Sequence, residues 1–190
     1  MANLIILEGL SRTGKSTICK SLSEKFKLRN ISIKNKMPEN VSLPDFYHGI
    51  HVVMNEIYRE FPEETFILDR SFLSELVYSK FFNRTTHQKE DSIISDLLFD
   101  NNFILVYLKN THSDYQNRGP KDRIIYSKED YEKQTDLFDW FFSTYKQNID
   151  TESWQNRFIE LNTSINSIEE CIENIEQTMS KNNFLKQIEI

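Results

Sequence analysis

The sequence predicts a doubly wound α/β fold built on a parallel sheet. Short apolar runs alternate with longer amphipathic stretches along the 190 residues. The first run, residues 3–8, leads into a glycine loop, and helical spacing follows at Ile18, Leu22 and Phe26. Right-handed crossovers between parallel strands then bring the loops that follow the strands to one edge of the sheet, where ligands bind.

Five apolar runs are predicted strands, because a strand buried on both faces reads as a continuous apolar segment. They are residues 3–8, 31–36, 65–69, 103–108 and 157–161. Helical periodicity predicts helices that begin after Lys15 and over residues 46–61, 72–82, 91–100, 128–148 and 165–179. The polar stretches 83–89 and 109–127 are expected to lie outside regular structure.

Length, charge and cysteine content restrict the class of protein. A chain of 190 residues fits one domain, so residues 1–190 are predicted to form a single unit. The net charge of −6 argues against binding of nucleic acid on a broad basic face. Binding through a local basic pocket is the remaining alternative. No apolar run reaches the ~20 residues of a membrane span. The two distant cysteines do not suggest a disulfide framework, and we expect a cytoplasmic protein without a membrane partner.

The segment from Gly9 to Thr17 has the spacing G-x-x-x-x-G-K-S-T of a phosphate-binding loop, between a predicted strand and a predicted helix. Glycines let backbone N–H groups turn inward around a phosphate, and the helix N-terminus adds a positive dipole. Lys15 would neutralise the β and γ oxygens, and Ser16 would hold Mg²⁺. The alternative is a glycine-rich turn that only caps a helix. The predicted ATP-binding residues of this segment are Gly9, Ser11, Thr13, Gly14, Lys15, Ser16 and Thr17.

Three charged residues join Lys15 as predicted catalytic residues. Arg12, inside the loop, would offset charge on the transferring phosphoryl group, or else be a solvated loop arginine. Asp69 ends the third predicted strand and, with Ser16, is the candidate metal ligand. Arg70 would clamp an acceptor phosphate. The alternative for this pair is a helix cap followed by a solvated arginine.

These motifs resemble the thymidylate kinase family of P-loop nucleoside monophosphate kinases. The matching segments, in the same order along the chain, are residues 8–17, 37–39, 69–71, 118–119 and 122–123. The resemblance implies strand order 2-3-1-4-5, ATP as donor, Mg²⁺ as cofactor, a deoxynucleoside monophosphate as acceptor and a possible homodimer. It also implies that residues 110–127 form a mobile lid, whose Arg118 and Arg123 close over ATP, and that Asn162 lies in the loop that contacts adenine.

Residues Glu39, Arg70 and Phe72 are the predicted acceptor contacts. Glu39 would touch the acceptor sugar or base, with an exposed loop carboxylate as the alternative. Phe72 would stack on a base, whereas an aromatic residue at helical spacing also fits a core position. The family has an acid where this chain has Ser11, so the acceptor pocket is expected to differ.

The predicted function is Mg²⁺- and ATP-dependent phosphoryl transfer to a deoxynucleoside monophosphate, with dTMP to dTDP as the first candidate reaction. The acceptor phosphate would itself be the nucleophile, so no protein base is required. One alternative is a deoxynucleoside kinase, whose 5′-hydroxyl acceptor needs Glu39 or Asp69 as general base. A kinase acting on a hydroxyl group in DNA and a nucleotide-binding switch without kinase activity are the others.

Overall fold

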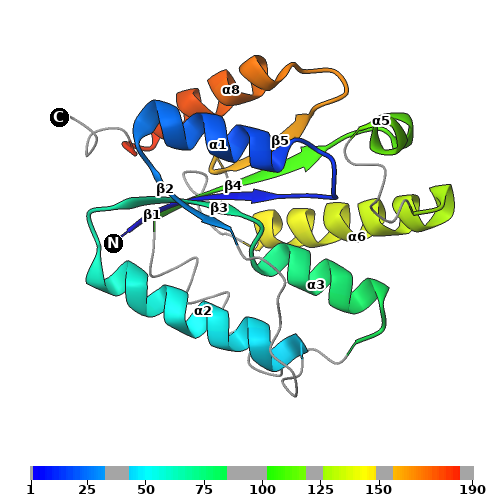
Figure 1. Ribbon diagram of the computed structural model, residues 1–190, viewed down its shortest axis with the longest axis horizontal. Helices are drawn as coiled ribbons and strands as arrows, with labels where there is room; N and C mark the ends of the chain where they lie inside the picture. Colours follow the sequence, from blue (N-terminus) through cyan, green and yellow to red (C-terminus); the bar gives the residue numbers. More distant parts are fainter. Residues whose placement is uncertain (1, 33–42, 85–101, 119–125, 149–155, 185–190) are drawn as a thin grey trace.

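The computed structural model describes residues 2–32, 43–84, 102–118, 126–148 and 156–184. Its centre is a parallel sheet of five strands in the order β2-β3-β1-β4-β5 (Figure 1). The strands are β1 (Asn3–Glu8), β2 (Arg29–Ser32), β3 (Thr65–Asp69), β4 (Asn102–Lys109) and β5 (Phe158–Asn162). The predicted fold class and the predicted strand order are therefore confirmed.

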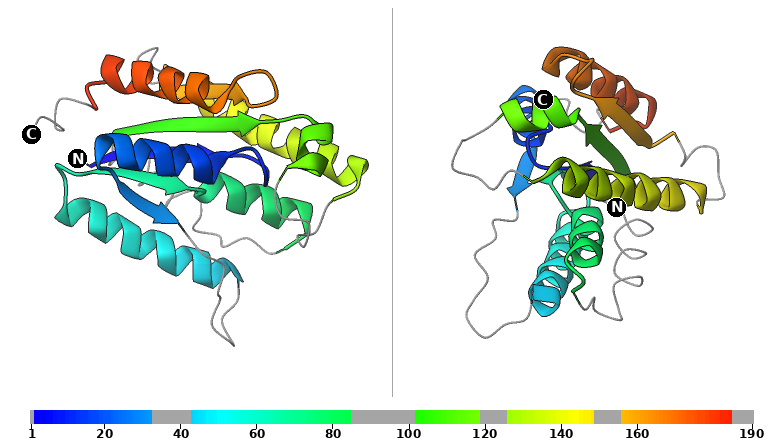
Figure 2. Two further views of the ribbon diagram at one scale, coloured as in Figure 1. Left: turned by 45° about the horizontal axis from the view of Figure 1, so that its top comes forward. Right: turned by 90° about the vertical axis from the view of Figure 1, so that its right-hand side faces the viewer.

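Helices cover both faces of this sheet (Figures 1 and 2). They are α1 (Lys15–Phe26), α2 (Leu43–Glu60), α3 (Phe72–Phe81), α5 (His112–Asn117), α6 (Lys128–Gln147) and α8 (Ile168–Lys181). On one face α1 and α8 pack against Ile5 and Leu7 of the central strand. On the other face α2, α3 and α6 pack against Leu4 and Ile6. The alternation of side chains along β1 thus divides the interior into two cores.

Several predicted boundaries need correction. Helix α2 begins at Leu43, three residues before the predicted segment 46–61, and several ends of the other strands and helices shift by one or two residues. Strand β2 begins at Arg29, two residues before the predicted segment 31–36, because its pairing with β3 starts at that polar residue. The last helix begins at Ile168 instead of residue 165, because Ser167 and Glu170 form a capping box that fixes its first turn. The polar stretch 109–127 contains the short helix α5, which the Thr111 hydroxyl caps by accepting from the N–H of Asp114 at 3.2 Å.

Other predictions fall beyond the part of the chain that the structure describes. They are the remainder of the second predicted strand, residues 33–36, the helix predicted over 91–100 and most of the predicted lid beyond α5. Within the described residues, no helix combines the length and apolar character needed to cross a membrane.

The carboxyl ends of the strands bring distant segments together. Strand β1 pairs with β3 so that Leu7 lies opposite Asp69, and it pairs with β4 so that Glu8 lies opposite Tyr107. The loop after β1, the start of α3 and the short helix α5 consequently share one end of the sheet (Figure 1). This is the edge at which parallel α/β sheets bind ligands.

Gly9 permits the closest approach between this loop and the sheet. A Cβ atom at Gly9 would lie 2.2 Å from the carbonyl oxygen of Leu108, and the residue has a φ of 131°. We expect Gly9→Ala to lower the free energy of unfolding by about 2 kcal/mol or more, through backbone strain and displacement of β4. Urea unfolding measures this change.

Gly49 offers a matched control, because it lies in α2 with no atom within 4 Å of an added Cβ. We expect Gly49→Ala to raise the free energy of unfolding by about 0.5 to 1 kcal/mol, since alanine is the better helix former. Equal unfolding midpoints for the two variants would show that the contact of Gly9 with β4 does not constrain the loop.

Candidate active site

The loop between β1 and α1 has the backbone of an anion cradle. Gly9, Arg12 and Gly14 have φ values of 131°, 66° and 87°, which turn successive peptide groups in the way a phosphate nest requires. Helix α1 begins after Gly14 without a side-chain cap and without an acidic residue in its first turn. The N–H groups at this helix end are therefore left to an external anion.

Lys15 is buried in the loop, with 5% of its surface exposed. Its ammonium group donates to the carbonyl oxygen of Leu10 and, at 2.9 Å, to the hydroxyl of Thr13. Burial lowers the pKa of Lys15 well below its usual value, and the charge of Arg70 lowers this pKa further. An anion bound in the loop would favour the charged form of Lys15 and relieve this penalty.

Ser16 and Asp69 meet at the entrance to the loop. The Ser16 hydroxyl donates to Oδ2 of Asp69 at 2.5 Å, which joins the start of α1 to the end of β3. A hydroxyl and a carboxylate oxygen are ligands of the type that Mg²⁺ accepts. Within the described segments no three His, Cys, Asp or Glu side chains form a metal cage. The pair therefore fits a Mg²⁺ ion that takes its other ligands from water and phosphate oxygens.

Arg70 lies between the phosphate loop and α3. Its φ of 76° and the hydrogen bond from its N–H to the Leu7 carbonyl, at 2.9 Å, fix the backbone. The guanidinium Nη1 donates to the hydroxyls of Ser74 and Tyr78, each at 3.1 Å, and Nη2 donates to Ser11 at 3.3 Å. Ser11, predicted to contact ATP, thus contacts the arginine predicted to bind the acceptor.

The side chain of Arg12 extends from the loop to α5. Its Nη1 donates to the carbonyl oxygens of Tyr115 at 3.0 Å and Gln116 at 3.3 Å, and the guanidinium carbon lies 5.4 Å from the centre of the Tyr115 ring. The C-terminal carbonyls of a helix attract a cation. The side chain of Asn110, between β4 and α5, donates to the Arg12 carbonyl at 3.3 Å, so the loop is joined both to α5 and to the segment that precedes it.

Arg118 binds the turn that follows β5. It donates to the carbonyl oxygen of Thr163 at 2.7 Å and to its hydroxyl at 3.0 Å, and it pairs with Asp114 at 3.3 Å. The side-chain oxygen of Asn162 accepts from the N–H of Ser164 at 2.9 Å and shapes the same turn. Arg118 thus contacts the residue next to Asn162, and both were predicted to bind ATP.

Phe72 and Thr17, in the described part of the chain, do not join these contacts. Phe72 lies in the core with 2% exposure, edge to face with Tyr145 at 5.5 Å, so its ring has no free face for a base. We therefore exclude Phe72 from the proposed acceptor site. Thr17 is exposed on the first turn of α1. Glu39 and Arg123 lie outside the described residues.

Ser74, Glu8 and Tyr115 were assigned no role from the sequence. Ser74 and Tyr78 follow Arg70 at intervals of four residues, which places them on one face of α3. That spacing was the available signal. Glu8 is the acidic last residue of an otherwise apolar strand, and such a position needs polar partners. Nothing in the sequence indicates that Tyr115 supports Arg12.

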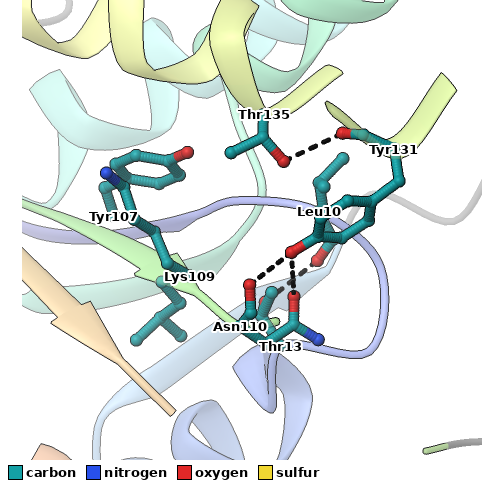
Figure 3. Close-up of a pocket in the computed structure, with 8 residues that line it drawn as sticks. Leu10, Thr13, Tyr107, Lys109, Asn110, Tyr131 and Thr135 are labelled. Carbon is teal, nitrogen blue, oxygen red and sulfur yellow. Dashed lines mark hydrogen bonds between the residues drawn. The ribbon is translucent and has the colours of Figure 1, made fainter. Parts of the chain in front are cut away.

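A small cavity lies behind the loop (Figure 3). It is lined by Leu10, Thr13, Tyr107, Leu108, Lys109, Asn110, Tyr131 and Thr135. In the close-up, the Tyr131 hydroxyl donates to the carbonyl oxygen of Asn110, the residue that also bonds to Arg12. Because Lys15, Asp69 and Arg70 do not line this cavity, we assign it to the packing between the loop, β4 and α6 and not to ligand binding.

The lowered pKa of Lys15 predicts a pH dependence of anion binding. Above its lowered pKa the free lysine is neutral, and a bound polyphosphate favours its protonation, so binding takes up a proton and weakens as pH rises. We expect the Kd for ADP to increase as pH rises toward the ordinary lysine pKa of about 10.4, and calorimetry in two buffers to show proton uptake. Lys15→Met is the control and should show no uptake. A Kd that does not change with pH, with no proton uptake, would contradict the lowered pKa of Lys15 in the empty loop.

Comparisons with known proteins agree on the fold. No family model and no curated protein sequence matches this chain. Among solved structures, YorR from Bacillus subtilis, in complex with phosphorylated GDP, is 21% identical with a TM-score of 0.67, over 95% of this chain and 98% of that one. Thymidylate kinase from Candida albicans is 17% identical with a TM-score of 0.61, over 98% and 93% of the two chains. Deoxyadenosine kinase from M. mycoides, with bound dATP, is 18% identical with a TM-score of 0.55, over 93% and 98%. The chain is therefore built on the P-loop kinase fold of the thymidylate-kinase type.

Proposed function

We propose that the protein transfers the γ-phosphoryl group of ATP, in a Mg²⁺-dependent reaction, to a deoxynucleoside monophosphate, with dTMP as the first acceptor to test. One observation carries this proposal. The phosphate loop and the half-buried guanidinium of Arg70 are in direct contact through Ser11, at 3.3 Å. A donor phosphate in the loop and an acceptor phosphate on Arg70 would therefore lie side by side.

The donor side uses the loop and the metal ligands. Backbone N–H groups at the start of α1, together with Lys15, would hold the β and γ phosphates of ATP. Ser16 and Asp69 would hold Mg²⁺, which supplies positive charge to the same phosphate oxygens. Arg118 and Asn162, both at the turn after β5, would contact the rest of the donor nucleotide, and Arg123 would close over it.

The acceptor side depends on the charge of Arg70. Within the described residues its side-chain hydrogen bonds all go to hydroxyl groups, those of Ser11, Ser74 and Tyr78. These partners orient the guanidinium without forming an ion pair with it. Burial opposes the charged form of Arg70, but the carboxylates of Glu8 and Asp69 act on its charge without contacting it and raise the pKa of Arg70. A phosphate dianion, which matches the planar fork of arginine, would add a counter-charge in direct contact.

The carboxylates near the loop favour a phosphate acceptor over a hydroxyl acceptor. Glu8 is bound by three hydrogen-bond donors, and Asp69 accepts from Ser16. A phosphate acceptor needs no general base, because its oxygen is already ionised.

Arg12, once released from the carbonyls of α5, would offset the charge of the transferred phosphoryl group.

A nucleoside 5′-hydroxyl is the second candidate acceptor. The similarity of fold to the M. mycoides deoxyadenosine kinase favours testing it. This acceptor requires a base to remove its proton, and the sequence offers Glu39 or Asp69 for that role. Because Asp69 already accepts from Ser16, Glu39 is the residue to test first. The two acceptors therefore predict different effects of one substitution, Glu39→Gln.

The direct test is ADP release from ATP and Mg²⁺ with deoxynucleoside monophosphates, deoxynucleosides or a short single-stranded DNA as acceptor. We expect turnover with monophosphates, dTMP foremost, that falls by about 100-fold or more in Lys15→Ala, which loses charge stabilisation in the transition state. Glu39→Gln should retain most of this activity, because transfer to a phosphate acceptor requires no proton abstraction. Turnover with nucleosides or DNA alone would contradict the proposed acceptor, and turnover that survives Lys15→Ala would contradict the site.

A further inference from the structure

Glu8 ends β1 with a fully buried carboxylate, 0% exposed. Its Oε1 accepts from the N–H groups of Ser71 at 2.8 Å and Leu73 at 3.1 Å. Its Oε2 accepts from the hydroxyl of Ser74. Each carboxylate oxygen therefore has its own set of partners, two backbone groups on one side and one side chain on the other.

The backbone partners belong to the first turn of α3. Ser71, the N-cap residue, makes no side-chain capping bond to its own helix. The carboxylate of Glu8, which lies in β1, accepts from these N–H groups in place of a cap from α3 itself. Its negative charge interacts favourably with the positive end of the helix dipole. The start of α3 is thereby fixed to the residue that directly precedes the phosphate loop.

The side-chain partner leads to Arg70. A serine hydroxyl has one proton, and Ser74 gives that proton to Glu8. Its lone pairs are then left to accept from Nη1 of Arg70, at 3.1 Å. Glu8 thus determines the direction in which the Ser74 hydroxyl points and makes it an acceptor for the guanidinium.

We propose that Glu8 is a positioning residue, which fixes the orientation of Arg70 through Ser74 and so sets the affinity for the acceptor phosphate. The inference rests on the proposed function, in which Arg70 binds that phosphate, and it deepens that function by naming what aims Arg70. Glu8 itself does not touch the substrate.

Ser74→Ala tests the relay without removing the backbone bonds of Glu8 to α3. We expect the KM for dTMP to rise on the order of tenfold, as for loss of a hydrogen bond to a charged group, while the KM for ATP changes little. The melting temperature should fall by roughly 2–4 °C, because the substitution leaves the buried Glu8 carboxylate without one of its donors. Ser74→Thr, which restores a hydroxyl, should recover most of the loss.

Ser79→Ala is the matched control. Ser79 is also a fully buried serine of α3 that donates to a carboxylate, that of Glu75 at 2.8 Å, and none of the hydrogen bonds of the Arg70 side chain goes to it. We expect its KM values to equal those of the wild type. An unchanged KM for dTMP in Ser74→Ala, or equal rises in both serine variants, would overturn the inference.

A double-mutant cycle separates positioning from capping. Glu8→Gln replaces Oε2 by an amide that donates to Ser74, so the Ser74 proton loses its acceptor and is no longer held away from Arg70. Glu8→Gln and Ser74→Ala together should therefore raise the KM for dTMP by less than the product of their separate effects. Additive effects of the two substitutions would assign Glu8 to capping alone. If Glu8→Gln does not fold, the comparison of Ser74→Ala with Ser79→Ala decides the question.

A spectroscopic readout keeps this test separate from the proposed function. In ligand-free protein, the ¹⁵N-labelled Nε–Hε signal that disappears in Arg70→Lys should shift in Ser74→Ala and stay in place in Ser79→Ala. A shift in a protein with no turnover on any acceptor would reject the proposed function and retain the positioning of Arg70. A signal that does not move would reject the positioning itself.

Discussion

The register of β1 against its neighbouring strands determines which side chains meet at the carboxyl edge of the sheet. With Leu7 opposite Asp69, the carboxylate of Asp69 reaches Ser16 in the first turn of α1, and the N–H of Arg70 reaches the carbonyl of Leu7. A slip by one residue would turn Asp69 toward the opposite face of the sheet and separate it from Ser16. The apolar side chains that alternate between the two cores hold this register, so the packing of the interior sets the geometry of the candidate site.

The same edge collects charges that burial makes unfavourable. Lys15 and Glu8 are both removed from solvent, which lowers the pKa of the lysine and raises that of the carboxylate. Their hydrogen bonds offset part of this penalty, because each charged group is surrounded by donors or acceptors of the correct type. A bound phosphate adds an opposite charge next to Lys15 and Arg70. Such a site is less stable when empty than an apolar core, and it gains most when a polyanion occupies it.

Local patterns in the sequence predict the sheet and the phosphate loop, and contacts between distant residues explain what the sequence does not reveal. Continuous apolar runs indicate buried strands, and the glycine and lysine spacing indicates the loop, since both signals are contained in a few adjacent residues. Helix α5 is too short to show a periodicity, and only the cap at Thr111 marks it. The burial of Phe72 depends on Tyr145, and the partners of Arg12 depend on where α5 packs. The roles assigned to Lys15 and the other predicted site residues remain proposals.

The central claim is that one edge of the sheet binds two phosphate groups at once, a donor in the loop and an acceptor on Arg70. The most direct measurement is the calorimetric Kd of a ligand that joins adenosine and thymidine 5′ to 5′ through a pentaphosphate. The account predicts a Kd on the order of 100-fold below those of ADP and dTMP measured separately, because binding of one half raises the effective concentration of the other. It also predicts that Arg70→Ala removes this gain while the affinity for ADP is retained. Binding of the joined ligand no tighter than that of ADP would contradict the claim.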